Sequence, residues 1–424
     1  MKFRFTQLSL FIITSTASIG AFFPINIFKP YDINLMPERW QGKCFQITGF
    51  YERGFNFHGF APDENEESRD FTRRVNVLQL YQDNQNALAM LKGFPAESEI
   101  ALFGQQFHRD GDNGVRGHLL PRGRFEVPYN FILSARYYFP YNINLQVHVP
   151  FMAMELRDVR FEDLTQDTRA EDRRIRELLT GRLVDVAQRL GGLDVGGWRR
   201  SGLGDIVVMS QWLEDFPQYK PLLKNVRLNA RLGLSLPTGL KQDEDRLLAI
   251  PFGNDGSLGL LFGGGLDLRF GSSLRLGGDI LLMHLFGSTR DRRIKTHIHQ
   301  TDLLFLAKAP TFKEFGWTQQ FNLYAQAWRF YRGLSFKVDY EYVKHLEDKL
   351  WLLNNNFNAQ IANTAESLQE STMHGLILNL NYDFYCDQPN ALIGPSIALF
   401  GKVGFNGKRA ILGNTVGIQL SLSF

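Results

Sequence analysis

The C-terminal stretch from Ile411 to Phe424 reads ILGNTVGIQLSLSF and predicts the fold class of the chain. In its second half, apolar residues alternate with small or polar ones, which is the two-residue period of a β-strand with one apolar and one polar face. The apolar positions are Val416, Ile418, Leu420, Leu422 and Phe424. A strand of a soluble β-sandwich can share this pattern, so the rest of the chain must decide between a soluble sheet and a barrel in lipid.

The N-terminal residues predict a secretory signal peptide over residues 1–20. Lys2 and Arg4 precede an apolar run from Leu8 to Thr14, and small residues follow this run, as in signal peptides that are removed after export. Residues 21–41 are punctuated by prolines and are expected to form a periplasmic N-terminal segment or a small plug in a lumen. Residues 42–424 would then form an outer-membrane β-barrel.

Composition agrees with a barrel and argues against other classes of protein. The 424 residues include 39 glycines and 13% aromatic residues, which suit crowded barrel strands and aromatic girdles at membrane interfaces. The net charge of +3 is too balanced to predict a nucleic-acid partner. Beyond Phe23 no run reaches the roughly 20 apolar residues of a membrane-spanning helix.

Segments with a two-residue period recur along the chain and give about fourteen predicted strands. An even number is expected of a single-chain outer-membrane barrel, and short turns alternate with long loops between the segments. The fold class is therefore an all-β transmembrane antiparallel β-barrel. The alternation is weakest in 75–83 and 99–108. The predicted strands are 43–54, 75–83, 99–108, 126–140, 142–154, 204–212, 226–236, 258–270, 274–284, 317–330, 334–342, 376–384, 397–405 and 411–424.

The hydrophobic period becomes helical between residues 162 and 200. Thr168 and Glu171 match a capping box, an apolar stripe follows from Ile175 to Leu190, and Gly191-Gly192 ends the run. We expect a helix in an extracellular loop. This loop could fold over the mouth or into the pore, or its helix could simply pack on its neighbours.

Charged residues occupy inward-facing positions of the predicted strands. They could line a pore and set its selectivity, or opposite charges could pair across the lumen and close it. The lumen-lining candidates are Arg227, Arg231, Asp267, Arg269, Arg275, Asp279, Lys337, Asp339 and Glu341.

Two short motifs and the chain end carry a family resemblance. The closing strand resembles that of bacterial outer-membrane barrels, with Phe424 as a signal for the barrel-assembly machinery. Gly202-Leu203-Gly204-Asp205 and Leu236-Pro237-Thr238-Gly239 resemble the turns of the phenol-degradation meta-pathway transporter family, relatives of the long-chain fatty-acid transporter barrels. This resemblance implies a channel in outer-membrane lipid for passive uptake of a small, often hydrophobic or aromatic, solute.

Other kinds of site have little support in the sequence. We find no Ser-His-Asp arrangement, phosphate-binding glycine loop or zinc helix, so we expect neither an enzyme nor a metal or cofactor. His297 and His299 are expected in a solvated loop. Cys44 and Cys386 are the two cysteines, and an oxidising compartment would allow them to form a disulfide. The alternative to a channel is a structural, adhesive or lipid-hydrolysing surface barrel with its function in the loops.

Overall fold

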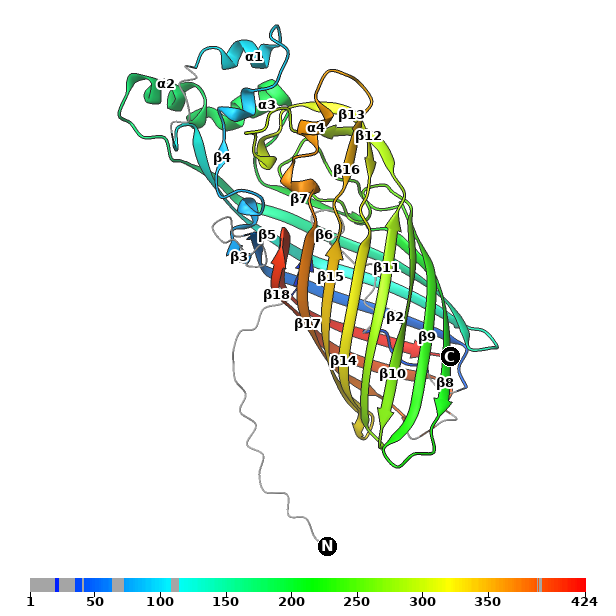
Figure 1. Ribbon diagram of the computed structural model, residues 1–424. Coiled ribbons are helices and arrows are strands. Elements are labelled where there is room, and N and C mark those ends of the chain that lie inside the picture. Colours follow the sequence, from blue (N-terminus) through cyan, green and yellow to red (C-terminus); the bar gives the residue numbers. More distant parts are fainter. Residues whose placement is uncertain are drawn as a thin grey trace, which may run out of the picture.

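Twelve antiparallel strands in the described part of the chain close into a barrel, because β19 pairs with β2 as well as with β18 (Figure 1). The computed structural model describes residues 20–22, 35–39, 42–62, 72–107, 114–386, 388 and 391–424. The barrel strands in their order around the ring are β2 (Phe45–Pro62), β5 (His118–Tyr138), β6 (Ile143–Asp163), β8 (Ile206–Pro217), β9 (Leu223–Leu236), β10 (Gly259–Phe270), β11 (Leu274–Leu285), β14 (Thr318–Tyr331), β15 (Leu334–His345), β17 (Ser371–Asp383), β18 (Gly394–Lys408) and β19 (Ala410–Ser423).

The expected count of about fourteen strands was too high, because two of the predicted segments are not barrel strands. Segment 75–83 contains the 3-10 helix η1 (Val77–Gln79), and segment 99–108 contains α1 (Glu99–Gly104) as far as it is described. Side chains hold both helices: Asn76 accepts from the Leu78 N–H, and Ser98 Oγ accepts from the Ala101 N–H at 3.2 Å. Such local capping competes with sheet formation.

The predicted C-terminal strand closes the ring. Phe424 N–H donates to the Phe45 carbonyl at 2.7 Å, and its own carbonyl accepts from Cys44 N–H at 3.0 Å. The Phe45 and Phe424 ring centroids lie 6.4 Å apart. A short strand, β1 (Gly20–Phe22), also pairs with β19. The predicted signal peptide, 1–20, lies outside the described residues apart from Gly20, as does most of 21–41.

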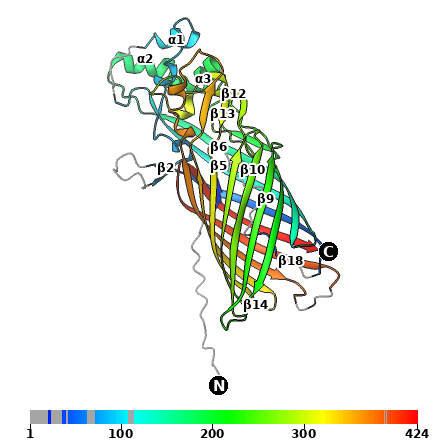
Figure 2. The ribbon, with the colours of Figure 1, turned by 45° about the vertical axis from the view of Figure 1, so that its right-hand side comes forward.

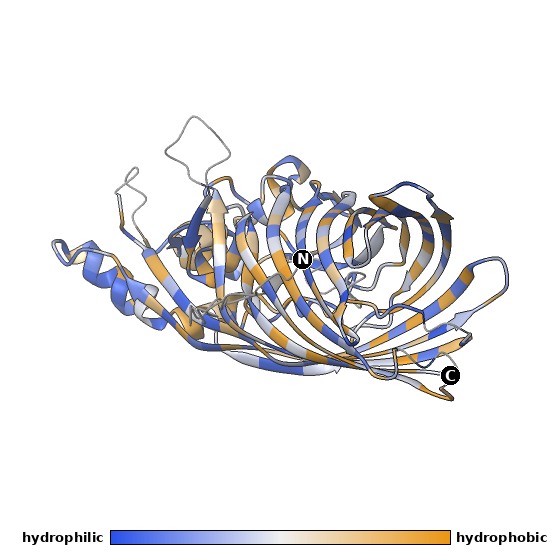
Figure 3. Cartoon of the chain, turned by 90° about the horizontal axis from the view of Figure 1, so that it is seen from below, coloured by the Kyte–Doolittle hydropathy of each residue, from blue (hydrophilic) through white to orange (hydrophobic). Residues whose placement is uncertain are grey.

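The barrel is apolar outside and polar inside. Figure 3 shows hydrophobic and hydrophilic positions alternating along the strands. On β9, Leu232 is 58% exposed on the outer face, whereas the preceding Arg231 is 4% exposed inside. The same holds on β11, where Ile280 is exposed and Asp279 is buried. An apolar outer face is what a barrel needs in contact with lipid.

The connections differ at the two ends of the barrel, and the long ones build a folded cap over one end (Figures 1 and 2). The short turns lie at the opposite end; β18 and β19 are joined at the capped end by Arg409 alone. Elements outside the ring are β3 (Thr72–Val75), β4 (Gln85–Asn86), η2 (Ala89–Leu91), α2 (Ala170–Leu178), η3 (Thr180–Arg182), α3 (Leu183–Gly191), β7 (Trp198–Leu203), β12 (Ser288–Arg293), η4 (Asp302–Leu304), β13 (Lys308–Glu314), β16 (Lys349–Leu352), α4 (Ala359–Ala362) and η5 (Glu366–Leu368).

The predicted helical loop forms α2 and α3 in this cap. The capping carboxylate is Asp172 rather than Glu171, and it accepts from Arg169 N–H at 2.8 Å. The chain leaves α3 at Gly192, which has a positive φ. The apolar stripe packs on Leu304 and Leu306, so the helices bury their apolar face against neighbouring loops. No helix in the described ranges is long and apolar enough to cross a membrane.

We expect Gly265→Ala in β10 to lower the free energy of unfolding by about 1–3 kcal/mol, because overpacking a filled interior is destabilising. A Cβ at Gly265 would lie 2.6 Å from Asp279 Oδ2 and 2.8 Å from the Gly278 carbonyl oxygen. Gly278→Ala is the matched control, since its Cβ would meet the mobile end of Leu323 at 3.1 Å. Urea unfolding of both variants in lipid checks this, and equal losses would contradict it.

Candidate functional site

The barrel interior contains all nine predicted charged residues, on β9, β10, β11 and β15. Asp339 is the most buried of them, at 1% exposure, and Arg231, Arg275, Asp279 and Glu341 are also buried. The remaining four are partly buried. The alternation of the strands thus predicted on which face these side chains lie, while their role in selectivity stays a prediction.

One buried ion pair joins two strands of the barrel across the strand that lies between them. At this place the middle strand carries only glycines on its inner face. Arg231 on β9 pairs with Asp279 on β11, and their side chains are 1% and 8% exposed. Between them, β10 presents Gly263 and Gly265 at the inward positions opposite these two residues. The glycine run therefore makes room for an ion pair against the wall of the barrel.

Other interior charges also have partners, on their own strand or on another strand of the ring. Lys337 Nζ lies 3.6 Å from Asp339 Oδ2 and 3.9 Å from the Tyr324 ring centroid. Tyr324 donates its hydroxyl hydrogen to Asp267 at 2.7 Å. Such pairing favours the alternative in which opposite charges fill the lumen instead of forming a ring around an open pore.

Two interior charges that form a close contact were not among the nine candidates. Glu52 on β2 and Lys402 on β18 form an ion pair at 3.0 Å, and Asn130 donates to Glu52 at 2.8 Å. Both charges occupy inward positions of predicted strands. The same alternation that found the nine candidates could therefore have found them.

A short segment before β2 crosses the barrel at the end with the short turns. Pro37 accepts from Arg136 of β5 at 3.1 Å, and the Glu38 carbonyl accepts from Gln46 of β2 at 3.1 Å. The Glu38 carboxylate contacts Arg275 of β11, which lies half the ring away from β2. We call residues 35–39 the strap.

Apolar side chains fill the barrel interior near the capped end. Phe57, Phe125 and Trp198 stack edge to face, with successive ring centroids 5.4 and 6.1 Å apart. Trp198 also donates its indole N–H to the Leu247 carbonyl at 2.7 Å. This cluster joins the barrel wall to the cap loop that follows β9.

The apolar patch 303–306 links the parts of the cap. Leu303 belongs to the cluster at the barrel mouth, Leu304 and Leu306 belong to the cluster around α3, and Phe305 belongs to a third cluster with Leu350. These four consecutive residues therefore connect three apolar clusters. The cap is a folded unit rather than a set of separate loops.

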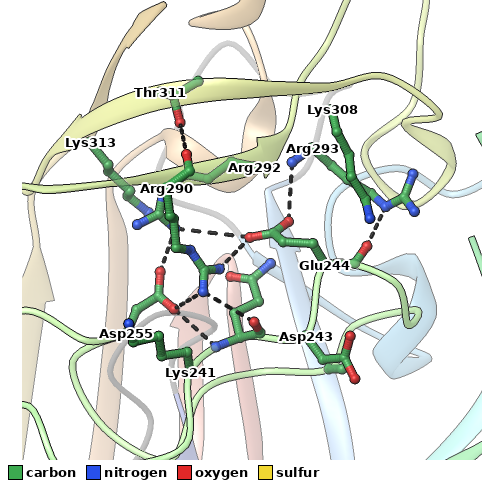
Figure 4. Close-up of polar contacts among 12 residues, drawn as sticks. Lys241, Asp243, Glu244, Asp255, Arg290, Arg292, Arg293, Lys308, Thr311 and Lys313 are labelled. Carbon is green, nitrogen blue, oxygen red and sulfur yellow. Dashed lines mark hydrogen bonds and ion pairs between the residues drawn. The ribbon is translucent and has the colours of Figure 1, made fainter. Parts of the chain in front are cut away.

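Beneath the small sheet of β12, β13 and β16 lies a network of buried ion pairs (Figure 4). Arg290 and Arg292 reach from β12 to Asp255 and Glu244, which come from the connection between β9 and β10. Arg293 lies 3.1 Å from Asp245 of the same connection. These contacts fasten the connection to the sheet.

The two turn motifs, at 202–205 and 236–239, meet at one place, where β8 begins and β9 has ended. Thr238 donates to the Gly204 carbonyl at 3.0 Å, and Asp205 accepts from Gly239 N–H at 2.8 Å. Asp205 also accepts from Asn254 N–H at 2.5 Å and is 3% exposed. Gly202 lies at the end of β7, and Pro237 begins the turn. The motifs have a shared structural role at the mouth.

Cys44 and Cys386 are not joined by a disulfide in the structure. Cys44 precedes β2 and Cys386 follows β17, with β18 and β19 between these two strands in the ring. Three strand spacings amount to roughly 14 Å, whereas disulfide Cα atoms lie roughly 4.4–6.8 Å apart. A disulfide between these two positions would therefore require the backbone to move.

The fold and the site define an all-β closed barrel with a charged interior, an apolar outer surface and a folded cap. No family model matches the sequence, and no curated protein matches it. The chain is similar in structure to an outer membrane channel from Pseudomonas putida F1, with 10% identity over 92% of this chain and 100% of that chain and a TM-score of 0.48.

Two further solved structures are similar over most of their length. The toluene transporter TbuX of Ralstonia pickettii is 10% identical over 90% of each chain, with a TM-score of 0.35. The toluene transporter TodX of P. putida is 9% identical over 92% of each chain, with a TM-score of 0.32. Sequence identities of 9–10% and TM-scores below 0.5 carry no argument about the function of this chain.

We expect the cap to lose stability as the pH falls through about 4 to 2. Burial opposes ionisation of Asp348, but Lys313 and His345, each 2.9 Å from a carboxylate oxygen, lower its pKa to about 2 from 3.8. Because the folded-state pKa is the lower one, the ionised carboxylate stabilises the cap above the unfolded-state value by about 2 kcal/mol, and protonation removes this contribution.

Hydrogen exchange of β13 and β16 measured across this pH range checks the prediction. Asp348→Asn should exchange faster at neutral pH and show a smaller acid dependence than the parent chain. An Asp348→Asn protein with the parent's exchange rates at every pH would contradict it.

Proposed function

We propose that the protein is a bacterial outer-membrane channel for passive uptake of a small, hydrophobic or aromatic solute. The observation that supports this best is the contrast between the two faces of the barrel wall. Leu232 and Ile280 are exposed on the outer face, where lipid would cover them, while Arg231 and Asp279 lie inside. Ionisable groups are costly in an apolar interior unless they are paired or solvated. The partly buried charges Arg227, Asp267, Arg269 and Lys337 could therefore contact water or solute in the lumen.

Under this proposal the membrane, the assembly machinery and the solute are the partners. Outer-membrane lipid would surround the ring, and the barrel-assembly machinery would recognise the strand that ends at Phe424. The nine charged residues described above would line the path and set which solutes pass. The short turns would face the periplasm and the cap would be extracellular, as in other barrels of this kind.

Residues 21–41 would act as a small plug, of which the strap and the end of β1 are the described parts. Glu38 supports this, because its carboxylate contacts Arg275 and lies 3.9 Å from Arg227, on the wall opposite β2. The strap therefore holds both sides of the lumen at once. Solute passage would require these contacts to open.

Under this proposal the protein lets the solute diffuse through the barrel and catalyses no reaction. The alternative is a structural, adhesive or lipid-hydrolysing surface barrel. The aromatic cluster of Phe57, Phe125 and Trp198 favours this alternative, because these side chains occupy part of the barrel interior near the capped end. Planar bilayers and a lipid-hydrolysis assay separate the two. Absence of both conductance and solute uptake would support the alternative.

We expect Glu38→Gln to increase the rate of liposome swelling several-fold, because a neutral amide holds Arg275 and Arg227 more weakly than a carboxylate does. Swelling is measured with a panel of sugars, fatty acids and aromatic acids. Glu97→Gln is the control, because Glu97 is an exposed carboxylate in the cap without a contact among the described residues.

The control should swell at the parent rate. If Glu38→Gln swells no faster than the parent while the parent takes up solute, the strap does not restrict passage. If neither protein takes up any solute of the panel, the channel proposal itself is wrong.

A further inference from the structure

A cavity of about 130 Å³ lies inside the cap, apart from the charged interior of the barrel. Its walls come from segments far apart in the sequence: the connection after β9, the sheet of β12, β13 and β16, the η4 region and the loop before β17. The cavity is therefore formed only when the cap is folded. Its position places it at the end where a solute would enter.

Part of the cavity lining is apolar, and we call this part its apolar side. Leu247 and Ile250 line it from the connection after β9, Leu303 and Phe305 from the η4 region, and Leu350 from β16. All five side chains are buried. This side can take an apolar body by shape and by the hydrophobic effect, but it offers nothing to an inorganic ion.

Much of the rest of the lining is charged, and most of its cations already have partners. Arg292 pairs with Asp255, Arg293 with Asp245 at 3.1 Å, and Arg246 with Asp243 at 3.5 Å. Lys313 pairs with Asp348 at 2.9 Å. Glu244 in the lining pairs with Arg290. Asp302, the remaining carboxylate of the lining, forms no ion pair among the described residues and accepts from Gln82 and from the Glu366 and Ser367 N–H groups.

Lys295 differs from the other cations. Its ammonium group donates to the Thr364 carbonyl at 3.3 Å, and it forms no ion pair with a carboxylate among the described residues. The residue is only 6% exposed and lines the cavity. An ammonium group has three donors, and burying it without a paired carboxylate is costly, so an anion bound beside it would be stabilising.

Tyr81 gives the cavity a second donor. It lines the same cavity and is 8% exposed. Its hydroxyl group has no hydrogen bond within the described ranges of the chain. A phenol and an ammonium group at one cavity can together hold a carboxylate.

We propose that this cavity binds a small organic anion: a monocarboxylate whose apolar body is about the size of one aromatic ring. Lys295 would pair with the carboxylate, Tyr81 would donate to it, and the apolar side would cover the body. A cavity of roughly 150 Å³ holds benzene in another protein, so the volume suits one ring and excludes long acyl chains. Binding of this anion in the cap does not depend on the proposed function. Only the further step, that the bound anion is also the transported solute, rests on the proposed function.

Binding is measured by isothermal titration calorimetry on the full chain in detergent, with benzoate, toluene and inorganic phosphate as separate probes. We expect benzoate to bind and the other two probes to bind at least tenfold more weakly. Toluene lacks the carboxylate that would pair with Lys295, and inorganic phosphate lacks the apolar ring. Lys295→Met should weaken benzoate about tenfold or more by removing a charged hydrogen bond. Lys295→Arg should retain part of the affinity.

Lys349→Met is the matched control, because Lys349 is an exposed lysine of the same cap that rests on Trp351 at 4.4 Å, outside the cavity. It should bind benzoate as the parent does. Equal affinity of the parent and Lys295→Met would overturn the inference, and so would toluene binding as tightly as benzoate.

Liposome swelling separates this inference from the proposed function. Benzoate binding that depends on Lys295, without solute uptake, would support the site and contradict the channel. Uptake of sugars or aromatic acids with no benzoate binding would support the channel and overturn the site.

Discussion

The hydrogen bonds between β19 and β2 are the constraint on which the rest of the structure depends. A sheet with two open edges would present unpaired N–H and C=O groups, which lipid cannot satisfy. Here the last residue, Phe424, both donates to and accepts from the backbone beside Phe45. With the ring closed, inward and outward positions are fixed for every strand, so one repeating period separates an apolar outer surface from a charged interior.

The sequence predicted the parts of the molecule that follow from local period, and it missed the parts that depend on distant contacts. Alternation located the twelve barrel strands and the inward charges such as Arg231 and Asp279. It failed at 75–83 and 99–108, where capping by Asn76 and Ser98 favours helical turns. It gave no sign of the contact between Glu38 and Arg275, which are joined across the barrel by folding alone.

Buried charges are paired with opposite charges both in the barrel interior and in the cap, and the pairs have a different structural role in each place. In the barrel, glycines of β10 let Arg231 and Asp279 meet against the wall, which leaves the middle of the ring for other side chains. In the cap, arginines of β12 fasten the connection after β9. Lys295 stands apart from both networks, because it is buried and has no carboxylate among the described residues.

The junction at 303–306 bears on how such a barrel can be altered. Long extracellular loops usually accept inserted sequence, because they contribute little to the folded core. In this protein an insertion in one long connection would disturb three apolar clusters that share these four residues. The tolerant positions lie instead in the short turns, where Tyr219 and Leu392 are 101% and 88% exposed. A peptide tag is therefore better placed at the end that faces away from the cap.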